Sequence, residues 1–258
     1  MCQHVVEMRR DQALAYHENL YCACQLPARG ESFLRRISMK TLPVFLALTL
    51  CIAAPVLADE TLFQDDFKGR LGAGWSWVRE HRAAWRVSER GLEVRIEPGN
   101  MWGKANDAKN VLVRPAPDAS GGTIEVTVAV ENRPSAQYEQ VDLVWYYNDG
   151  HMVKIGQELV NGKLSIVMGR EENDRTRTVN IIPLTGMKVQ LRLRVQGNRV
   201  RGQFLPEGVE AWQDVGECDL PAPAEAKPKI SLQFYQGPAD AEHWARVSAF
   251  RVRRLSPS

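Results

Sequence analysis

The sequence predicts an all-β fold, a two-sheet antiparallel jelly-roll sandwich, on three observations. From Glu60 onward, apolar and polar residues alternate in short runs, as in strands with one buried and one wet face. About fourteen such runs follow one another, with turn residues between them every ~8–12 residues. None of them has the 3.6-residue apolar period of an amphipathic helix. Many short strands joined by hairpin turns form a sandwich or barrel, and wet outer faces favour two packed sheets.

The segment before Glu60 has a different character. Residues 1–38 show no sustained periodicity, whereas Met39 opens a short basic region, followed by an apolar run and small residues that end at Ala58. That order is typical of a secretory signal peptide cleaved after Ala58. We therefore expect a non-native or disordered extension over 1–38, a signal peptide over 39–58 and a single domain over 59–258. A genuine cytoplasmic extension is the alternative for the first segment, and the mature protein is expected to be secreted or periplasmic.

Charge and cysteine content narrow the partners. Six of the 33 Lys and Arg and four of the 31 Asp and Glu precede Asp59, which leaves 27 of each. A neutral mature chain predicts no nucleic-acid partner and, after signal cleavage, no membrane partner. Cys218 is the only cysteine after Ala58, so no intramolecular disulfide is expected. One cysteine and scattered histidines predict no structural zinc, and we expect no cofactor.

The first half of the mature chain divides into strands at turn signals. Arg90-Gly91 marks an early turn. Trp77 and Trp85 alternate with polar residues and are expected in the core, where large aromatic side chains supply stability. The expected strands cover residues 62–67, 75–78, 84–87, 92–96, 110–114 and 123–131.

The second half begins with a central strand, Tyr138 to Tyr147. Asn148-Asp-Gly150 ends it, and Asn161-Gly162 is a two-residue hairpin signal. The charged segment 170–177 is expected to be a loop, and the Pro- and Ala-rich segment 221–228 a connection. The remaining strands are expected over residues 152–160, 163–168, 189–195, 200–205, 230–234 and 245–253.

The central strand has two contrasting faces. Val141, Leu143 and Trp145 point one way and predict a core face. The opposite face carries Gln140 and Asp142 together with Tyr146. An amide, a carboxylate and a phenol on one face suit a polar ligand such as a sugar, whose hydroxyls need hydrogen bonds. The alternative is that these side chains are solvated or bonded to a neighbouring loop.

Several segments together resemble a known superfamily: Asp65-Asp-Phe67, Gly74-Trp-Ser-Trp77 with Trp85-Arg-Val, the strand Tyr138 to Trp145, and Phe234 to Trp244 before a closing strand. The pattern resembles the concanavalin A-like lectin/glucanase superfamily over nearly the whole mature chain. Within it, the chain is similar to an uncharacterised branch related to the C-terminal domains of family-43 xylosidases. The resemblance implies a sandwich whose concave sheet binds carbohydrate, by analogy of fold.

Catalysis is not expected. Glucanases of this superfamily place Glu-x-Asp-x-Glu on one strand, whereas Glu139 and Asp142 are three residues apart and point to opposite faces. Glu171, Glu172 and Asp174 are interpreted as solvated charges. The paired acids Asp65 and Asp66 resemble those of calcium-binding sandwiches, but two carboxylates are too few for an ion that takes six or more oxygens.

The sequence thus predicts an exported, non-catalytic protein whose partner is a polysaccharide or other glycan. The alternatives are a glycan-active hydrolase on the same fold and a structural envelope protein without a small ligand. Trp102, between turn residues, is expected to be an exposed stacking platform. Aromatic planes stack on sugar rings while amides and carboxylates bind hydroxyls. The candidate carbohydrate-binding residues are Trp102, Tyr138, Gln140, Asp142, Tyr146, Tyr235, His243 and Trp244.

Overall fold

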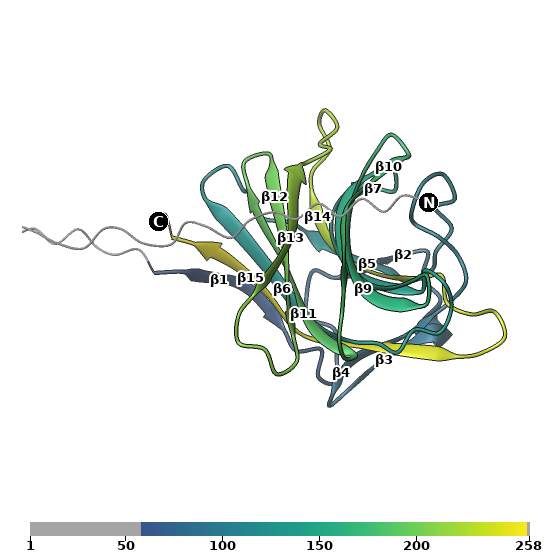
Figure 1. Cartoon of the computed structure of the whole chain (residues 1–258). Coiled ribbons are helices and arrows are strands. Elements are labelled where there is room, and N and C mark those ends of the chain that lie inside the picture. Colours follow the sequence, from purple (N-terminus) through teal and green to yellow (C-terminus); the bar gives the residue numbers. More distant parts are fainter. Residues whose placement is uncertain (1–57, 257–258) are drawn as a thin grey trace, which may run out of the picture. The chain divides into compact units, whose positions relative to one another are not determined.

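The structure is a computed structural model that describes residues 58–256, all within one compact unit. The predicted extension over 1–38 and the signal peptide, apart from its last residue, lie outside the described residues. Two antiparallel sheets pack face to face (Figure 1), which confirms the predicted jelly-roll sandwich. Besides strands, the described residues contain one short 3₁₀ helix, η1 (Arg82–Ala84).

The first sheet has eight strands, and β1 (Glu60–Asp65) joins it by pairing with β15. From one edge to the other, its remaining strands are β13 (Gln213–Asp219), β12 (Arg199–Pro206), β11 (Lys188–Gln196), β6 (Thr123–Glu131), β15 (His243–Leu255), β4 (Gly91–Ile96) and β3 (Trp85–Ser88).

The second sheet has seven strands and carries the polar face predicted for the central strand. In order, they are β10 (Arg175–Pro183), β9 (Lys163–Glu172), β8 (His151–Val160), β7 (Gln140–Asn148), β14 (Lys229–Tyr235), β5 (Val111–Pro115) and β2 (Ser76–Val78). The expected central strand is therefore β7, in the middle of this sheet.

The core lies between the two sheets. Val141, Leu143 and Trp145 of β7 are at most 1% exposed and belong to its main hydrophobic cluster, as predicted from their alternation. Trp77 and Trp85 are partly buried against that cluster, with ring centroids 5.0 Å apart. Cys218 is a buried free thiol, and the described part of the chain has no helix long and apolar enough to cross a membrane.

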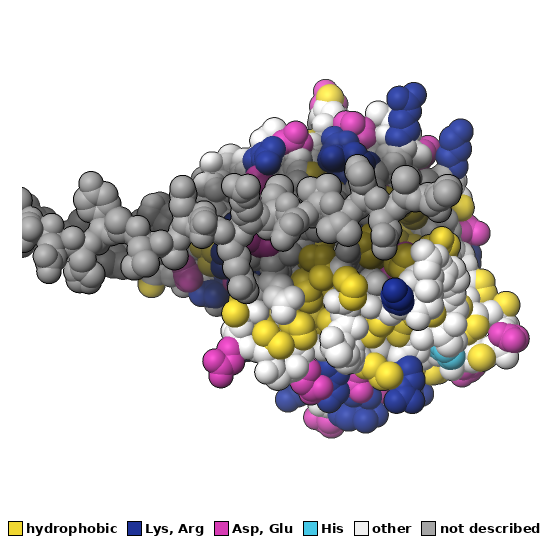
Figure 2. Space-filling view, in the orientation of Figure 1, with side chains coloured by type: hydrophobic (Ala, Val, Ile, Leu, Met, Phe, Trp, Pro, Cys, Tyr) yellow, Lys and Arg dark blue, Asp and Glu magenta, His cyan; other side chains and the backbone are white. Residues whose placement is uncertain are grey.

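The outer face of the first sheet carries balanced charges. Glu125 accepts hydrogen bonds from Arg194 at 2.8 Å and from Arg253 at 3.4 Å, so cations on adjacent strands share one carboxylate. In the view of Figure 2, basic and acidic side chains are likewise intermixed on the surface. Arg194 of β11 and Arg253 of β15 are thus neutralised by an acid on β6, the strand between them.

The prediction of a charged loop over 170–177 is wrong. Its residues end β9 and begin β10, joined by a tight turn at Asn173 and Asp174. Both turn residues have positive φ, 53° and 59°, which matches the twist that hairpin turns require. Strand β10 lies at the sheet edge and is mostly exposed, and edge strands carry charges that prevent further pairing. Strand β13 was missed as well, because Gln213 to Asp219 has weak apolar alternation.

Candidate functional site

The outer face of the second sheet brings together two polar segments that are far apart in sequence. Strand β14 pairs with β7 so that Gln233 lies opposite Asp142 and Tyr235 lies opposite Gln140. On the other side of β7, Gly156 of β8 lies opposite Asp142, and a Cβ at Gly156 would overlap the Asp142 carboxylate. The glycine thus leaves room for a buried acid above the sheet.

An ammonium group lies at the centre of this face. Lys154 Nζ donates to Gln140 Oε1, to Glu158 Oε2 at 3.2 Å and to the Tyr235 hydroxyl at 3.3 Å, and it lies 3.6 Å from Asp142 Oδ2. All five residues are at most 6% exposed. Buried charges persist only when they are paired and hydrogen-bonded, and here one cation is surrounded by two carboxylates, an amide and a phenol. Sequence analysis missed Lys154 and Glu158 because, at those positions, they resemble ordinary surface charges.

Burial changes the titration of this cluster. It raises the pKa of Asp142 to about 6, opposed by the positive charge of Lys154 and assisted by the negative charge of Glu158. The pKa of Tyr235 is also raised well above its usual value, first by burial and then by the adjacent Asp142. Asp142 is therefore ionised at neutral pH and neutral in mild acid, while the phenol stays protonated.

A loop, residues 97–110, covers one end of the face. Its Trp102 packs on β9, where a Cβ at Gly169 would overlap the indole, and its Gly103 N–H donates to both carboxylate oxygens of Glu171, at 3.1 and 3.2 Å. Glu171 is completely buried, and burial raises its pKa to about 7. The interpretation of Glu171 as a solvated charge is therefore wrong, because the 97–110 loop covers it near the end of β9. Its alternation with Gly169 and Val167 was the signal that could have placed it on this face.

Under the loop, a second small hydrophobic cluster separates part of the face from solvent. Tyr146 and Tyr235 belong to it, and the Tyr146 hydroxyl donates to Asp149 at 2.7 Å. Burial, and next the Asp149 carboxylate, raises the pKa of the Tyr146 phenol. The buried members of the cluster are Met101, Ala108, Val111, Val113, Val144, Tyr146, Met152 and Tyr235.

Beyond the loop the face stays open as a groove of about 470 Å³. Three of the predicted residues line it: Trp102, Tyr138 and Gln140. Trp102 is partly buried, with its ring centroid 4.9 Å from Lys154 Nζ, and Tyr138 is 45% exposed. Asp142, Tyr146 and Tyr235 lie on the same face but are covered. The full lining is Trp102, Tyr138, Gln140, Lys154, Glu158, Val160, Asn161, Val167, Thr178, Ile181 and Gln236.

Residues 64–222 match the family of β-xylosidase C-terminal concanavalin A-like domains. The chain belongs to this family. Among solved structures, the family-43 protein BlXynB of Bacillus licheniformis superposes with a TM-score of 0.66 at 19% identity, covering 74% of this chain and 39% of that one. A xylan β-1,4-xylosidase of Bacillus halodurans C-125 superposes with a TM-score of 0.64 at 19% identity, covering 74% of this chain and 39% of that one. A functionally unknown protein of Saccharomyces cerevisiae superposes with a TM-score of 0.56 at 13% identity, covering 72% of this chain and 98% of that one.

At these identities the superpositions show the fold alone. The chain covers 39% of the length of each of the two Bacillus proteins, so it corresponds to one part of them. No curated protein matches the chain. Membership of the xylosidase C-terminal domain family therefore fixes the architecture, and the side chains of the groove have to carry the functional argument.

His243 is the first residue of β15, in the first sheet, and its side chain contacts the loop before β7. Its Nδ1 is 3.1 Å from both oxygens of the buried Glu139, and Ser135 Oγ lies 3.3 Å from its Nε2. Glu139 also accepts the backbone N–H groups of Ser135 and Ala136, at 2.8 and 3.1 Å. Glu139 thus holds the loop through two backbone amides as well as through the imidazole. His243 thus ties β15 to the loop before β7 and does not line the groove.

The structure places Trp244 away from the predicted site. It belongs to β15 of the first sheet, its ring lies 4.4 Å from the Arg86 guanidinium, and its Nε1 donates to Glu242 at 3.2 Å. The sequence prediction grouped it with Tyr235 because both lie near the Phe234–Trp244 segment. That segment crosses from one sheet to the other, so the two rings occupy different faces of the sandwich.

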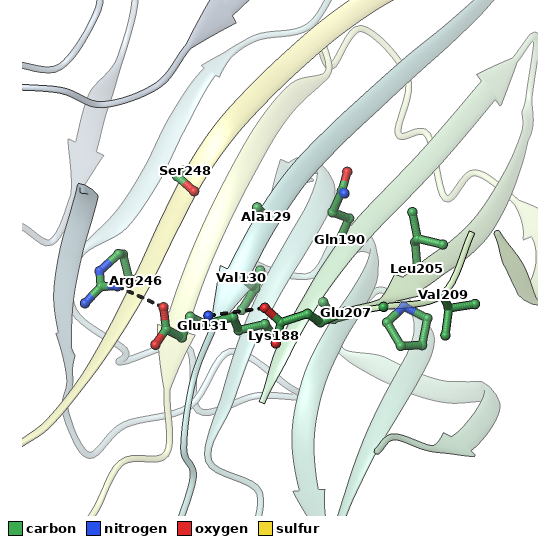
Figure 3. A pocket seen from close by; sticks show the side chains of 13 residues that line it. Ala129, Val130, Glu131, Lys188, Gln190, Leu205, Glu207, Val209, Arg246 and Ser248 are labelled. Carbon is green, nitrogen blue, oxygen red and sulfur yellow. Dashed lines mark hydrogen bonds and ion pairs between the residues drawn. The ribbon is translucent and has the colours of Figure 1, made fainter. Parts of the chain in front are cut away.

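A second hollow, of about 320 Å³, lies on the outer face of the first sheet (Figure 3). Its charged groups pair with one another: Arg246 Nη1 with Glu131 at 2.8 Å, and Lys188 with Glu207 at 3.3 Å. No aromatic residue is among those that line it. It lacks the stacking plane that a sugar needs, and its four charged side chains are paired with one another.

Asp65, one of the two acids considered for calcium, has other partners. Asp65 accepts N–H groups of Phe67 and Gly72, each at 2.7 Å, and the Trp75 indole N–H at 3.0 Å. Both of its oxygens are thus used in closing the loop after β1. Within residues 58–256, no three His, Cys, Asp or Glu side chains are grouped as metal ligands.

Proposed function

We propose that this domain is an exported, non-catalytic glycan-binding module whose ligand lies in the groove on the outer face of the second sheet. One observation carries the proposal: the aromatic side chains Trp102 and Tyr138 border the same cavity as the amide of Gln140 and the carboxylate of Glu158. Sugars present C–H groups on the ring face and hydroxyls around the ring edge. An aromatic wall beside hydrogen-bonding groups is complementary to both.

The size of the groove and the family support the proposal. A cavity of about 470 Å³ is in the range of small-ligand sites and open enough for a sugar unit within a chain. Relatives of the same fold include a xylan β-1,4-xylosidase and a xyloglucan-locus protein of family 43. Xylan and xyloglucan oligosaccharides are therefore the first ligands to test.

The experiment is titration calorimetry of the domain over 59–258 with xylan- and xyloglucan-derived oligosaccharides, with reducing-sugar release measured in parallel. Trp102→Ala should weaken binding at least tenfold if a sugar ring gains from the indole what a nucleic-acid base gains from an aromatic plane, ~1–3 kcal/mol. Trp212→Ala is the control, because that indole stacks on Arg192 of the first sheet, 3.9 Å away. Binding unaffected by Trp102→Ala would remove the groove from consideration.

The other functional classes correspond to other results. Release of reducing sugar would point to a hydrolase, and no binding to any glycan would favour a structural envelope protein. Export is tested by N-terminal sequencing of the secreted product, which should begin at or near Asp59. A secreted product that still carries residues 1–38 would contradict the predicted processing.

A further inference from the structure

The floor of the groove is negatively charged. Asp142 and Glu158 flank a single ammonium group, and Lys154 is the only cation among the described residues that line the cavity. Glu171 adds a third carboxylate on the same face, under the adjoining loop. One positive charge is therefore set against the carboxylates of Asp142 and Glu158, and against Glu171 only in part, because burial raises the pKa of Glu171 to about 7.

Lys154 has no proton left for a ligand. Its three N–H bonds are directed at Gln140, Glu158 and Tyr235, while Asp142 completes the surrounding shell. An acidic sugar entering the groove would meet a cation that is already neutralised. The acidic sugar would also meet the carboxylates around Lys154, which outnumber this one ammonium group.

Glu158 lies on the wall of the groove. Glu158 is 6% exposed and lines the cavity, and its Oε2 accepts a hydrogen bond from Lys154 Nζ. Its other oxygen receives no hydrogen bond from the described protein groups, so it is an acceptor without a protein donor. A sugar hydroxyl can donate to it, whereas a sugar carboxylate is repelled by it, and more strongly than in water because the site is partly desolvated.

We propose that the groove selects by charge, accepting uncharged sugars and rejecting uronic acids, and that Glu158 and Asp142 are the residues that determine this specificity. The inference rests on the proposed glycan-binding function and adds the class of ligand to it. Specificity of this kind is built from repulsion of the wrong ligand as much as from contacts to the right one. The two carboxylates, held in place by Lys154, supply that repulsion.

The test compares one polymer with and without its charges: glucuronoxylan and the same sample after chemical reduction of its carboxyl groups to alcohols. Calorimetric titration of the domain should show at least about fivefold tighter binding of the reduced form, equivalent to ~1 kcal/mol. Glu158→Gln keeps an acceptor for Lys154 while removing the charge, and should narrow the difference to about twofold. Raising NaCl to ~0.5 M should narrow it too, because screening weakens charge repulsion.

Each result has a distinct meaning. Equal binding of the two polymers by the unmodified domain would overturn the charge selection alone. A preference that persists unchanged in Glu158→Gln and in high salt would mean that the carboxyl is excluded by its shape, which also contradicts the proposal. Failure of both polymers to bind would count against the glycan-binding function itself.

Discussion

Lys154 Nζ lies 3.6 Å from Asp142 Oδ2, although both side chains are almost completely buried on the outer face of a sheet. The core between the sheets is apolar and needs no such pair. Replacing a buried ion pair by apolar groups is often neutral or stabilising, so stability alone does not account for it. Its position beneath an open groove accounts for it better, since the pair fixes Gln140 and Glu158 on the wall of the groove.

Lys154→Met should destabilise the domain by about 3–5 kcal/mol, because it leaves Asp142 and Glu158 buried without a cation. Urea unfolding of the two proteins measures the change. The double variant Lys154→Met with Asp142→Asn should recover much of the loss, since the deepest uncompensated charge is removed with its partner. A single variant as stable as the parent protein would show that the ion pair is not formed.

Trp145→Ala should cost about 3–5 kcal/mol, because the indole is 1% exposed in the main core and its removal leaves a cavity. Val209→Ala is the matched control, since Val209 is 40% exposed and its truncation should change stability by less than ~0.5 kcal/mol. Both are read from denaturant midpoints. A loss below about 1 kcal/mol at Trp145 would mean that β7 turns its other face to the core.

Gly169→Ala should displace Trp102 from its seat on β9, because the new methyl group would overlap the indole. We expect a shifted tryptophan fluorescence spectrum and at least about tenfold weaker glycan binding, with the domain still folded. Gly121→Ala controls for the glycine-to-alanine change, since a Cβ there meets only the Arg254 guanidinium at 3.6 Å, an ordinary contact. Unchanged fluorescence and binding in Gly169→Ala would contradict the packing of Trp102.

The sequence was sufficient for the fold and for three of the eleven residues that line the groove, Trp102, Tyr138 and Gln140. Strand alternation placed Gln140 and Asp142 on the face opposite Trp145, and this followed from the two-residue period of a strand. It could not show that Tyr235 would lie beside Gln140, because strand order depends on contacts distant in sequence. For the same reason Trp244 was assigned to the wrong sheet.

The sequence also could not show which charged side chains are buried. In the sequence, Glu158 and Glu171 look like solvent-exposed strand residues. They are buried only because the loop over 97–110 covers Glu171 and the Lys154 ammonium binds Glu158. Whether a charged residue on an outer sheet face is solvated depends on what folds over it. That is a tertiary property, and it was the one that decided the candidate site.

Glu171→Gln should remove a pH dependence of stability. Burial raises the pKa of Glu171 from 4.5 to about 7 in the folded protein, so between these pH values the folded state holds a proton that the unfolded state has lost. Stability from this group is therefore highest below pH ~4.5 and falls as pH rises toward 7, by up to ~3 kcal/mol at 1.4 kcal/mol per pKa unit. Glutamine keeps an acceptor for the Gly103 N–H and carries no charge. The unfolding free energy of the variant should equal that of the parent protein near pH 4.5 and exceed it at pH 7.5. Asp142 and the other acids titrate in both proteins, so their contributions cancel in this comparison. Urea unfolding at several pH values measures this, and a difference that does not grow with pH would show that Glu171 ionises freely in the folded state.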